Sequence, residues 1–274
     1  MPIKQTMGQI LLGTQGWNYD AWVGSFYPKG TRPSNYLRVY ARAFRTVEVD
    51  STFYGTPPAK TVEGWAARSP DGFIFSLKLP REITHERQLE DVGQALHEFT
   101  TRARLLGPRL GAILIQLGPG FGPERRRKLE HFLPLLPGDL RFAIEFRRPE
   151  WIGPSLLDLL TAHNVALALT DARWIPRETA LSLAETPTAD HAYVRWMGPD
   201  RKIEDFSRVA VERTHEIAEW APRLAALAAR VSTVYGYFNN HFQGHSPASA
   251  RTLQQILGQR PVAPEELAEQ PDLF

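Results

Sequence analysis

Eight short runs rich in β-branched and aromatic residues alternate along the chain with stretches in which apolar residues recur every three or four positions. The first pattern is typical of strands, and the second is typical of helices that bury one face. One such helical face carries Tyr36, Leu37, Tyr40 and Phe44. The predicted strands are residues 10–14, 46–50, 73–78, 112–117, 141–146, 165–170, 192–196 and 233–239.

Eight strand–helix units over about 250 residues predict an α/β fold, a single (β/α)₈ barrel of the TIM type. The sixth unit is irregular, because no regular helix can be placed in residues 171–190. We expect one domain over residues 1–260 and a flexible C-terminal tail over 261–274, which is rich in proline and glutamate. An open doubly wound sheet is the alternative, but no glycine-rich phosphate-binding sequence follows the first strand, so no nucleotide cofactor motif is present.

The alternation within the strands predicts a polar group inside the barrel. In Val47-Glu48-Val49, the two apolar valines would face the surrounding helices, and this places the side chain of Glu48 inside the barrel. Each inward polar residue falls at the C-terminal end of its strand, where barrel enzymes build their active sites. The inward residues predicted in this way are Glu48, Asp50, Lys78, Gln116, Glu145, Arg147, Arg195 and Asn239.

These residue types suggest chemistry on an anionic group. Glu48 or Glu145 would act as a general base, while Lys78, Arg147 and Arg195 would bind a phosphate and stabilise developing negative charge. Ser246 and Pro247 predict a helix N-terminus after the last strand, where many barrels bind phosphate. The alternative is that the same charges form structural ion pairs that close the barrel mouth.

Aromatic residues are concentrated near the predicted rim. Trp17 and Tyr19 in the first loop, and Tyr54 after the second strand, would form a platform for a sugar ring or a nucleobase. The alternative is that these aromatic side chains fill the mouth of the barrel and bind no ligand. A carbohydrate-cleaving enzyme is a third possibility, since Glu48 and Glu145 form a candidate carboxylate pair.

Composition narrows the chemistry further. The chain has 274 residues, no cysteine and a net charge of +2, which excludes thiolate catalysis, disulfides and cysteine-ligated metals. A divalent ion held by Glu48, Glu145, Asp171 and His85 remains a possible cofactor. No apolar run approaches the roughly 20 residues of a membrane span, so we expect a cytoplasmic protein with no membrane partner.

Several motifs together resemble the YecE-like family, which is defined by domain of unknown function number 72. They are GTQGWNY at 13–19, WVGSFYP at 22–28, VEVDSTFY at 47–54, FIFSLK at 73–78, IEFR at 144–147, YVR at 193–195 and YFNN at 237–240. The resemblance implies a barrel fold but no settled reaction, and it adds Asn240 to the candidate substrate-binding residues. The chain departs from the family pattern at Trp196-Met197-Gly198, where the family has a His-Gly pair, and at 244–248.

The last residues suggest a partner. Gln270, Leu273 and Phe274 resemble the short peptide by which bacterial polymerases and repair proteins bind the sliding clamp. Alternatively, these apolar residues fold back onto the barrel. The run Arg125-Arg126-Arg127-Lys128 also suits nucleic acid, although a solvated helix face is the simpler interpretation.

We therefore expect an enzyme that acts on a phosphorylated substrate at the C-terminal rim of the barrel, with hydrolysis as the candidate reaction. The clamp-like tail favours nucleic acid and an association with DNA repair. The alternative is a non-catalytic module that binds an anionic small molecule or nucleic acid.

Overall fold

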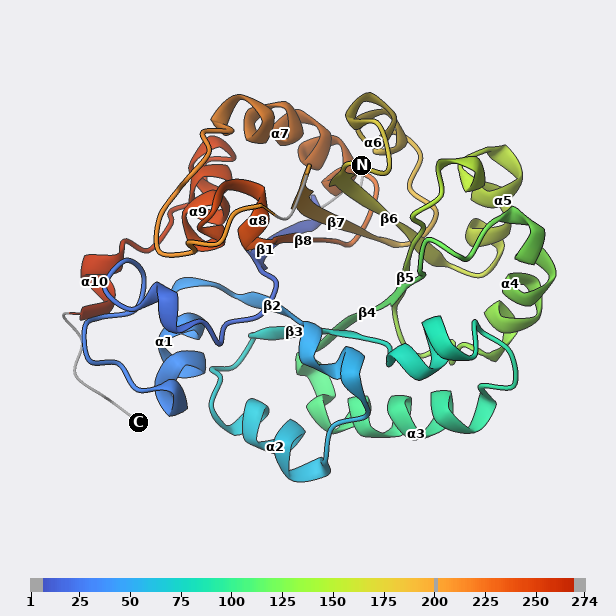
Figure 1. Cartoon of the computed structure of the whole chain (residues 1–274), viewed down its shortest axis with the longest axis horizontal. Helices are drawn as coiled ribbons and strands as arrows, with labels where there is room; N and C mark the ends of the chain where they lie inside the picture. Colours follow the sequence, from blue (N-terminus) through green and yellow to red (C-terminus); the bar gives the residue numbers. More distant parts are fainter. Residues whose placement is uncertain (1–6, 200–201, 269–274) are drawn as a thin grey trace, which may run out of the picture.

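In the computed structural model, residues 7–199 and 202–268 are described, and they contain an eight-stranded parallel sheet that curls into a nearly closed barrel (Figure 1). The spatial order of the strands is β1-β8-β7-β6-β5-β4-β3-β2. This confirms the barrel predicted from the sequence. The strands are β1 (Gln9–Thr14), β2 (Thr46–Val49), β3 (Ile74–Lys78), β4 (Leu110–Gln116), β5 (Phe142–Glu145), β6 (Val165–Ala172), β7 (His191–Gly198) and β8 (Thr233–Phe238).

Helices connect the strands and surround them on the outside (Figure 1). Of the helices in the described residues, none combines the length and apolar composition that crossing a bilayer requires. The helices are α1 (Tyr36–Ala43), α2 (Ala59–Ala67), α3 (Gly93–Ala103), α4 (Arg126–Phe132), α5 (Pro154–Ala162), α6 (Arg177–Leu183), α7 (Thr214–Ala228), α8 (Asn240–Gln243), α9 (Ser246–Ile256) and α10 (Pro264–Ala268).

The first and last strands of the open order meet only near their C-terminal ends. The Gly16 amide donates to the Glu48 carbonyl at 2.8 Å, and Gln15 forms an isolated parallel bridge with Glu48. On its other edge β1 pairs with β8 in full register, from Gln9 with Thr233 onward. The barrel therefore closes most tightly at the rim that carries the predicted polar residues.

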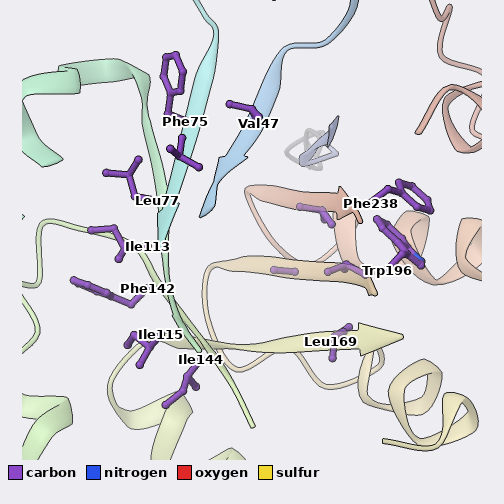
Figure 2. Packing of buried hydrophobic residues seen from close by; sticks show 14 of the residues in the cluster. Val47, Phe75, Leu77, Ile113, Ile115, Phe142, Ile144, Leu169, Trp196 and Phe238 are labelled. Carbon is purple, nitrogen blue, oxygen red and sulfur yellow. The ribbon is translucent and has the colours of Figure 1, made fainter. Parts of the chain in front are cut away.

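Outward-facing side chains form the larger core, between strands and helices. Val47, Leu77, Ile113 and Ile144 project from neighbouring strands into this layer (Figure 2). Each is fully buried, and burial of such side chains contributes about 1.5–3 kcal/mol apiece. The alternation assigned the valines beside Glu48 to the helix-facing side, and the structure confirms that assignment.

Inward-facing side chains form a second, smaller core that combines small and large residues. Alanines on β4, β5 and β6 leave room for Tyr193, Tyr235 and Tyr237 on β7 and β8. The Tyr237 hydroxyl donates to Ser76 Oγ at 2.8 Å and lies 2.7 Å from Thr46 Oγ1. The barrel interior is thus packed and hydrogen-bonded below the rim, and ligands can enter only from above it.

Three segments depart from a regular barrel. The sixth unit is irregular as predicted: β6 shifts register at Asp171 and Ala172, and α6 has only seven residues. Helix α8 is an additional short helix between β8 and α9. Residues 264–268 of the tail form α10 rather than a flexible segment, because Leu267 is buried and Arg42 on α1 donates to the Glu266 carbonyl.

Candidate functional site

Three charged side chains from three strands form one buried cluster at the C-terminal end of the barrel interior. Arg195 donates from Nε to Glu48 Oε2 at 3.0 Å and from Nη2 to Glu48 Oε1 at 2.8 Å. Its Nη1 donates to Glu145 Oε2. The Tyr193 hydroxyl also donates to Glu48, at 2.8 Å. Both carboxylates are completely buried, and the guanidinium balances one of their two negative charges.

These contacts favour the ionised form of Glu145. Burial would raise the pKa of Glu145, but the charges of Arg195 and Arg147 outweigh it and lower that pKa below its usual value. Burial opposes the charge of Arg195, yet Glu145 and Glu48 raise its pKa above the ordinary one. A carboxylate that is fully engaged by a guanidinium is a poor general base. Glu48 and Glu145 both hold Arg195 in place, and the expectation that one of them acts as the general base stays a prediction.

Lys78, at the end of β3, is the cation that is not neutralised in this way. The residue is only 8% exposed, and Nζ lies 3.8 Å from the centroid of the Phe53 ring. In the described part of the chain, Nζ has no hydrogen-bond or ion-pair partner. Burial, followed by the charge of Arg195, lowers the pKa of Lys78 to about 8. The amine is consequently neutral in about a tenth of the molecules at pH 7.

The loop after β2 is fixed against Lys78 by its own backbone. Thr52 is buried in the turn Asp50–Tyr54, where its hydroxyl donates to the Lys78 carbonyl at 2.7 Å. The Lys78 amide donates back to the same hydroxyl at 3.0 Å. This reciprocal pair places Phe53, the next residue, under the lysine ammonium. Asp50 at the start of the turn is exposed, and desolvation and the charge of Glu48 raise its pKa.

The loop after β3 carries His85 and Arg81 to the same rim. Residues 82–86 form a π-helical turn, in which His85 Nδ1 lies 2.8 Å from Thr84 Oγ1. Desolvation and the charge of Lys78 lower the pKa of His85. Three non-glycine residues follow in left-handed conformations: Gln88, Leu89 and Asp91, with φ of 50°, 68° and 51°. Such strain, about 1–3 kcal/mol per residue, is typical of loops whose shape serves a site.

A cavity of about 500 Å³ opens above these residues. Its walls come from the segments that follow β1, β2, β3, β5 and β8 and from the ends of β3, β4 and β7. Among the predicted site residues, the lining residues are Asp50, Tyr54, Lys78, His85, Gln116, Arg147, Arg195 and Asn239. This volume is that of a small-metabolite site or of one nucleotide unit.

A second cavity of about 290 Å³ adjoins the first and shares Arg147, Met197 and Asn239 with it. The Arg147 guanidinium lies over the Trp174 ring, 4.5 Å from its centroid, and Arg147 Nε lies 3.3 Å from Glu145 Oε1. Arg173 also lines this smaller cavity, and none of its lining residues in the described part of the chain is acidic. The two cavities together form an elongated site with Arg147 between them.

Asp171 lies apart from this site. Trp220 Nε1 donates to its carboxylate at 2.9 Å, and Arg177 forms an ion pair with the same oxygen at 2.8 Å. Burial raises the pKa of Asp171 even though these partners stabilise the charged form. The carboxylate connects β6 to α6 and α7, and it lines a different cavity. These contacts give Asp171 a structural role, and the expectation from the sequence that it also contributes to substrate binding stays a prediction.

The predicted phosphate site at the start of α9 is also occupied by the protein itself. Asn240 Oδ1 accepts from the Ser246 amide at 3.0 Å and from the Ser246 hydroxyl at 2.8 Å. Ser246 is 1% exposed, and the residue before the helix is His245 rather than Ser246. Asn240 thus fixes the helix end and does not line the cavity, because the additional helix α8 buries this region.

Two aromatic residues of the first loop pack away from the cavity. Trp17 contacts Trp65 edge-on, with ring centroids 6.0 Å apart, in the layer between the barrel and α2. The Tyr19 hydroxyl donates to the Gln15 carbonyl at 3.0 Å, and its ring packs on Trp22 at 4.6 Å. Neither residue lines the cavity. These two aromatic residues of the first loop therefore pack against the protein, whereas Tyr54, 79% exposed, lines the cavity.

Three further predictions concern a metal site, the basic run at 125–128 and the C-terminal residues. Within residues 7–199 and 202–268, no group of three or more histidine or acidic side chains is arranged to hold a metal ion, so the predicted ligand set does not assemble. In the basic run, Arg126 pairs with Glu130 and Lys128 with Glu90, as a solvated face would. Gln270, Leu273 and Phe274 lie outside the described residues.

Sequence reasoning missed several lining residues. Gln15 directly follows β1, and its Oε1 lies 2.8 Å from Asn239 Nδ2 in the cavity. Its inward position could have been predicted from the alternation of residues along the strand. Met197 occupies the position where the family pattern has histidine, a departure that also pointed to the site. Arg81 and His241 line the cavity from loops whose sequence gave no signal.

Comparisons with known proteins agree with this architecture. The family model described as "Protein of unknown function DUF72" matches residues 11–272. The chain is 34% identical to UPF0759 protein YecE of Escherichia coli K12, covering 93% of this chain and 94% of that protein. It is 25% identical to UPF0759 protein YunF of Bacillus subtilis, over 90% and 94% of the two chains.

Solved structures of the family share the fold. The crystal structure of a DUF72 family protein from Thermotoga maritima superimposes with a TM-score of 0.78 at 24% identity, covering 92% of this chain and all of that one. A second DUF72 family protein, from Enterococcus faecalis, gives a TM-score of 0.71 at 23% identity, over 92% and 99% of the two chains. The chain belongs to the DUF72 family, in which the UPF0759 proteins YecE and YunF are relatives.

Proposed function

We propose that this protein is an enzyme that acts on a phosphorylated substrate bound in the cavity at the C-terminal rim of the barrel. One observation carries the proposal: Lys78, a nearly buried lysine without an ion-pair partner in the described chain, faces a cavity that Arg147 and Arg195 also line. Converging cations in a partly dry site favour phosphate oxygens over neutral groups. The cost of burying an uncompensated ammonium is typical of functional sites.

In this proposal Arg195 is the preorganised cation of the site. Glu48 and Glu145 hold it from two sides, so its orientation is fixed before the substrate arrives. A fixed cation stabilises negative charge in the transition state without the reorganisation that a mobile side chain requires. Arg147 is less buried and lies between the two cavities, which suits direct contact with a phosphate.

Lys78 and Asp50 are the proposed proton carriers. The pKa of Lys78 is lowered to about 8, and that of Asp50 is raised from its usual value. Groups whose pKa values move toward neutrality can both donate and accept protons at working pH. This assignment replaces the carboxylates expected from the sequence, and it also disfavours a glycoside hydrolase, whose acid and base would be two available carboxyl groups.

Nucleic acid and small phosphorylated metabolites both satisfy this chemistry. The clamp-like residues Gln270, Leu273 and Phe274 favour nucleic acid on sequence grounds alone, and docking on a sliding clamp stays a proposal. We also propose that the protein is located in the cytoplasm.

Paired ligands test the proposal. Thermal stabilisation would be measured with phosphorylated compounds and their dephosphorylated counterparts, and binding with labelled single-stranded, duplex and abasic DNA at two salt concentrations. We expect only phosphorylated ligands to stabilise the protein, with the effect lost in Arg147→Gln and kept in Arg127→Gln, an exposed arginine on α4. Equal effects of both members of each pair would refute the proposal. Binding without any product would indicate the non-catalytic module instead.

A further inference from the structure

The surroundings of Lys78 suit a nucleophile better than a simple phosphate ligand. Its Nζ lies over the face of Phe53 at 3.8 Å, and no carboxylate in the described chain lies within ion-pair distance. A lysine that serves only to bind phosphate gains nothing from losing its proton. The Phe53 face favours the ammonium, but burial and the charge of Arg195 outweigh it, and the free amine that results can attack carbonyl carbon.

The adjoining cavity supplies a separate place for a phosphate. Arg147 and Arg173 line it, no acidic residue is among its described lining residues, and Trp174 Nε1 is a buried donor with no partner in the described residues. These three groups offer charge and directed hydrogen bonds to tetrahedral oxygens. A ligand that occupies both cavities would thus carry its phosphate at one end and its reacting atom near Lys78.

We propose that Lys78 forms an imine with the carbonyl carbon of a phosphorylated aldehyde or ketone whose phosphate lies in the smaller cavity. This inference rests on the proposed function and specifies its substrate class. Free sugar phosphates have this chemistry, and so does an abasic site in DNA, where the open sugar carries an aldehyde between two phosphates.

The step balances within the residues of the cavity. The lone pair of the neutral Nζ attacks the carbonyl carbon, a C–N bond forms, and one amine proton moves to the oxygen to give a carbinolamine. Asp50, protonated more often than an ordinary aspartate because its pKa is raised, donates a proton to the hydroxyl group. The C–O bond breaks, water leaves, and the iminium remains. No oxidant or reductant takes part, and hydrolysis reverses the same steps.

The fraction of free amine supports the chemistry quantitatively. A lysine whose pKa is about 8, instead of the ordinary 10.5, has about 300-fold more neutral amine at pH 7. Adduct formation should therefore rise with pH up to about 8 and then level off, whereas an exposed lysine would continue to gain reactivity beyond that point.

Reductive trapping tests the inference on the full-length protein. The protein would be incubated with sodium borohydride and dihydroxyacetone phosphate, glyceraldehyde 3-phosphate or an oligonucleotide with one abasic site, and the adduct located by peptide mass spectrometry. Dihydroxyacetone and glyceraldehyde serve as unphosphorylated controls. Lys78→Arg keeps the positive charge but cannot form an imine, and Lys60→Arg is the matched change at an exposed lysine on α2.

We expect at least one phosphorylated probe to label Lys78 roughly tenfold or more above Lys60, and Lys78→Arg to abolish that adduct while Lys60→Arg does not. The probe that labels distinguishes sugar phosphates from abasic DNA. Equal labelling of both lysines, or no adduct with any probe, would overturn the inference. If glycerol 3-phosphate, which lacks a carbonyl, still protects the protein against heat, then only the imine is refuted. If neither binding nor adduct is found, the proposed function fails as well.

Discussion

Replacing Arg195 by methionine tests the buried charge cluster at its centre. The change removes one cation that compensates two carboxylates with 0% exposure, Glu48 and Glu145, and it leaves the barrel backbone intact. Methionine has a similar length and no charge, so the main effect is electrostatic. We expect the folded state to be strongly destabilised, because neither carboxylate can reach water.

The magnitude follows from what remains after the substitution. Breaking a buried ion pair by removing one partner costs about 3–5 kcal/mol. Arg147 still lies 3.3 Å from Glu145, and Tyr193 still donates to Glu48 at 2.8 Å, which offsets part of the loss of the second pair. We therefore expect the free energy of unfolding to fall by about 4 kcal/mol at neutral pH. For a chain of this size that corresponds to a melting temperature lower by about 10 °C.

Urea denaturation at several pH values provides the assay. In the Arg195→Met variant the freed carboxyls prefer to be protonated, so their folded-state pKa values rise above those of the unfolded chain. The deficit relative to wild type is therefore largest at neutral pH and shrinks as the pH falls toward about 4.5. Arg148→Met, which breaks the exposed pair with Glu150, should leave stability nearly unchanged. A loss below about 1 kcal/mol, or a deficit that does not depend on pH, would refute this reasoning.

Three further substitutions examine the surroundings of the site. Tyr193→Phe removes a buried hydrogen bond to the charged Glu48 and should cost about 2 kcal/mol in urea denaturation; no change would mean that Glu48 does not need this donor. Gly236→Ala places a Cβ 2.9 Å from the Trp196 ring, and calorimetry should show a loss of about 1–3 kcal/mol from overpacking, unless the ring moves freely. The folded-state pKa of Lys78 lies below that of the unfolded chain, so wild-type stability should rise by about 2 kcal/mol between about pH 7 and 9.5. Lys78→Met should abolish that rise, and an identical pH profile in both proteins would contradict the assignment.

Strand parity predicted much of the site because a barrel strand has only two faces. Once the valines beside Glu48 were assigned to the helix layer, the carboxylate had to face inward, and the structure confirms this. The same reasoning placed Lys78 and Arg195 correctly. Parity could not show that one arginine binds both glutamates, because that pairing depends on side chains from three strands that lie far apart in the sequence.

Residues in loops were predicted less well, since no periodicity applies there. Trp17 and Tyr19 were assigned to a binding platform from composition alone, whereas the loop folds them against the protein. Asn240 follows an inward residue directly, yet the short helix α8 redirects it to the start of α9. Asp171 has the right strand position, but Trp220, on a helix more than forty residues later, accounts for its orientation.

The most direct test of the proposed site measures the reactivity of each lysine separately. The chain has only six lysines, so amine labelling followed by peptide mass spectrometry can follow each of them as a function of pH, with and without glycerol 3-phosphate. We expect Lys78 to titrate with a pKa of about 8, and its labelling to be suppressed by the phosphorylated ligand while that of Lys60 is not. A Lys78 that titrates near the ordinary lysine value of about 10.4, or whose labelling is indifferent to the ligand, would contradict the proposed site.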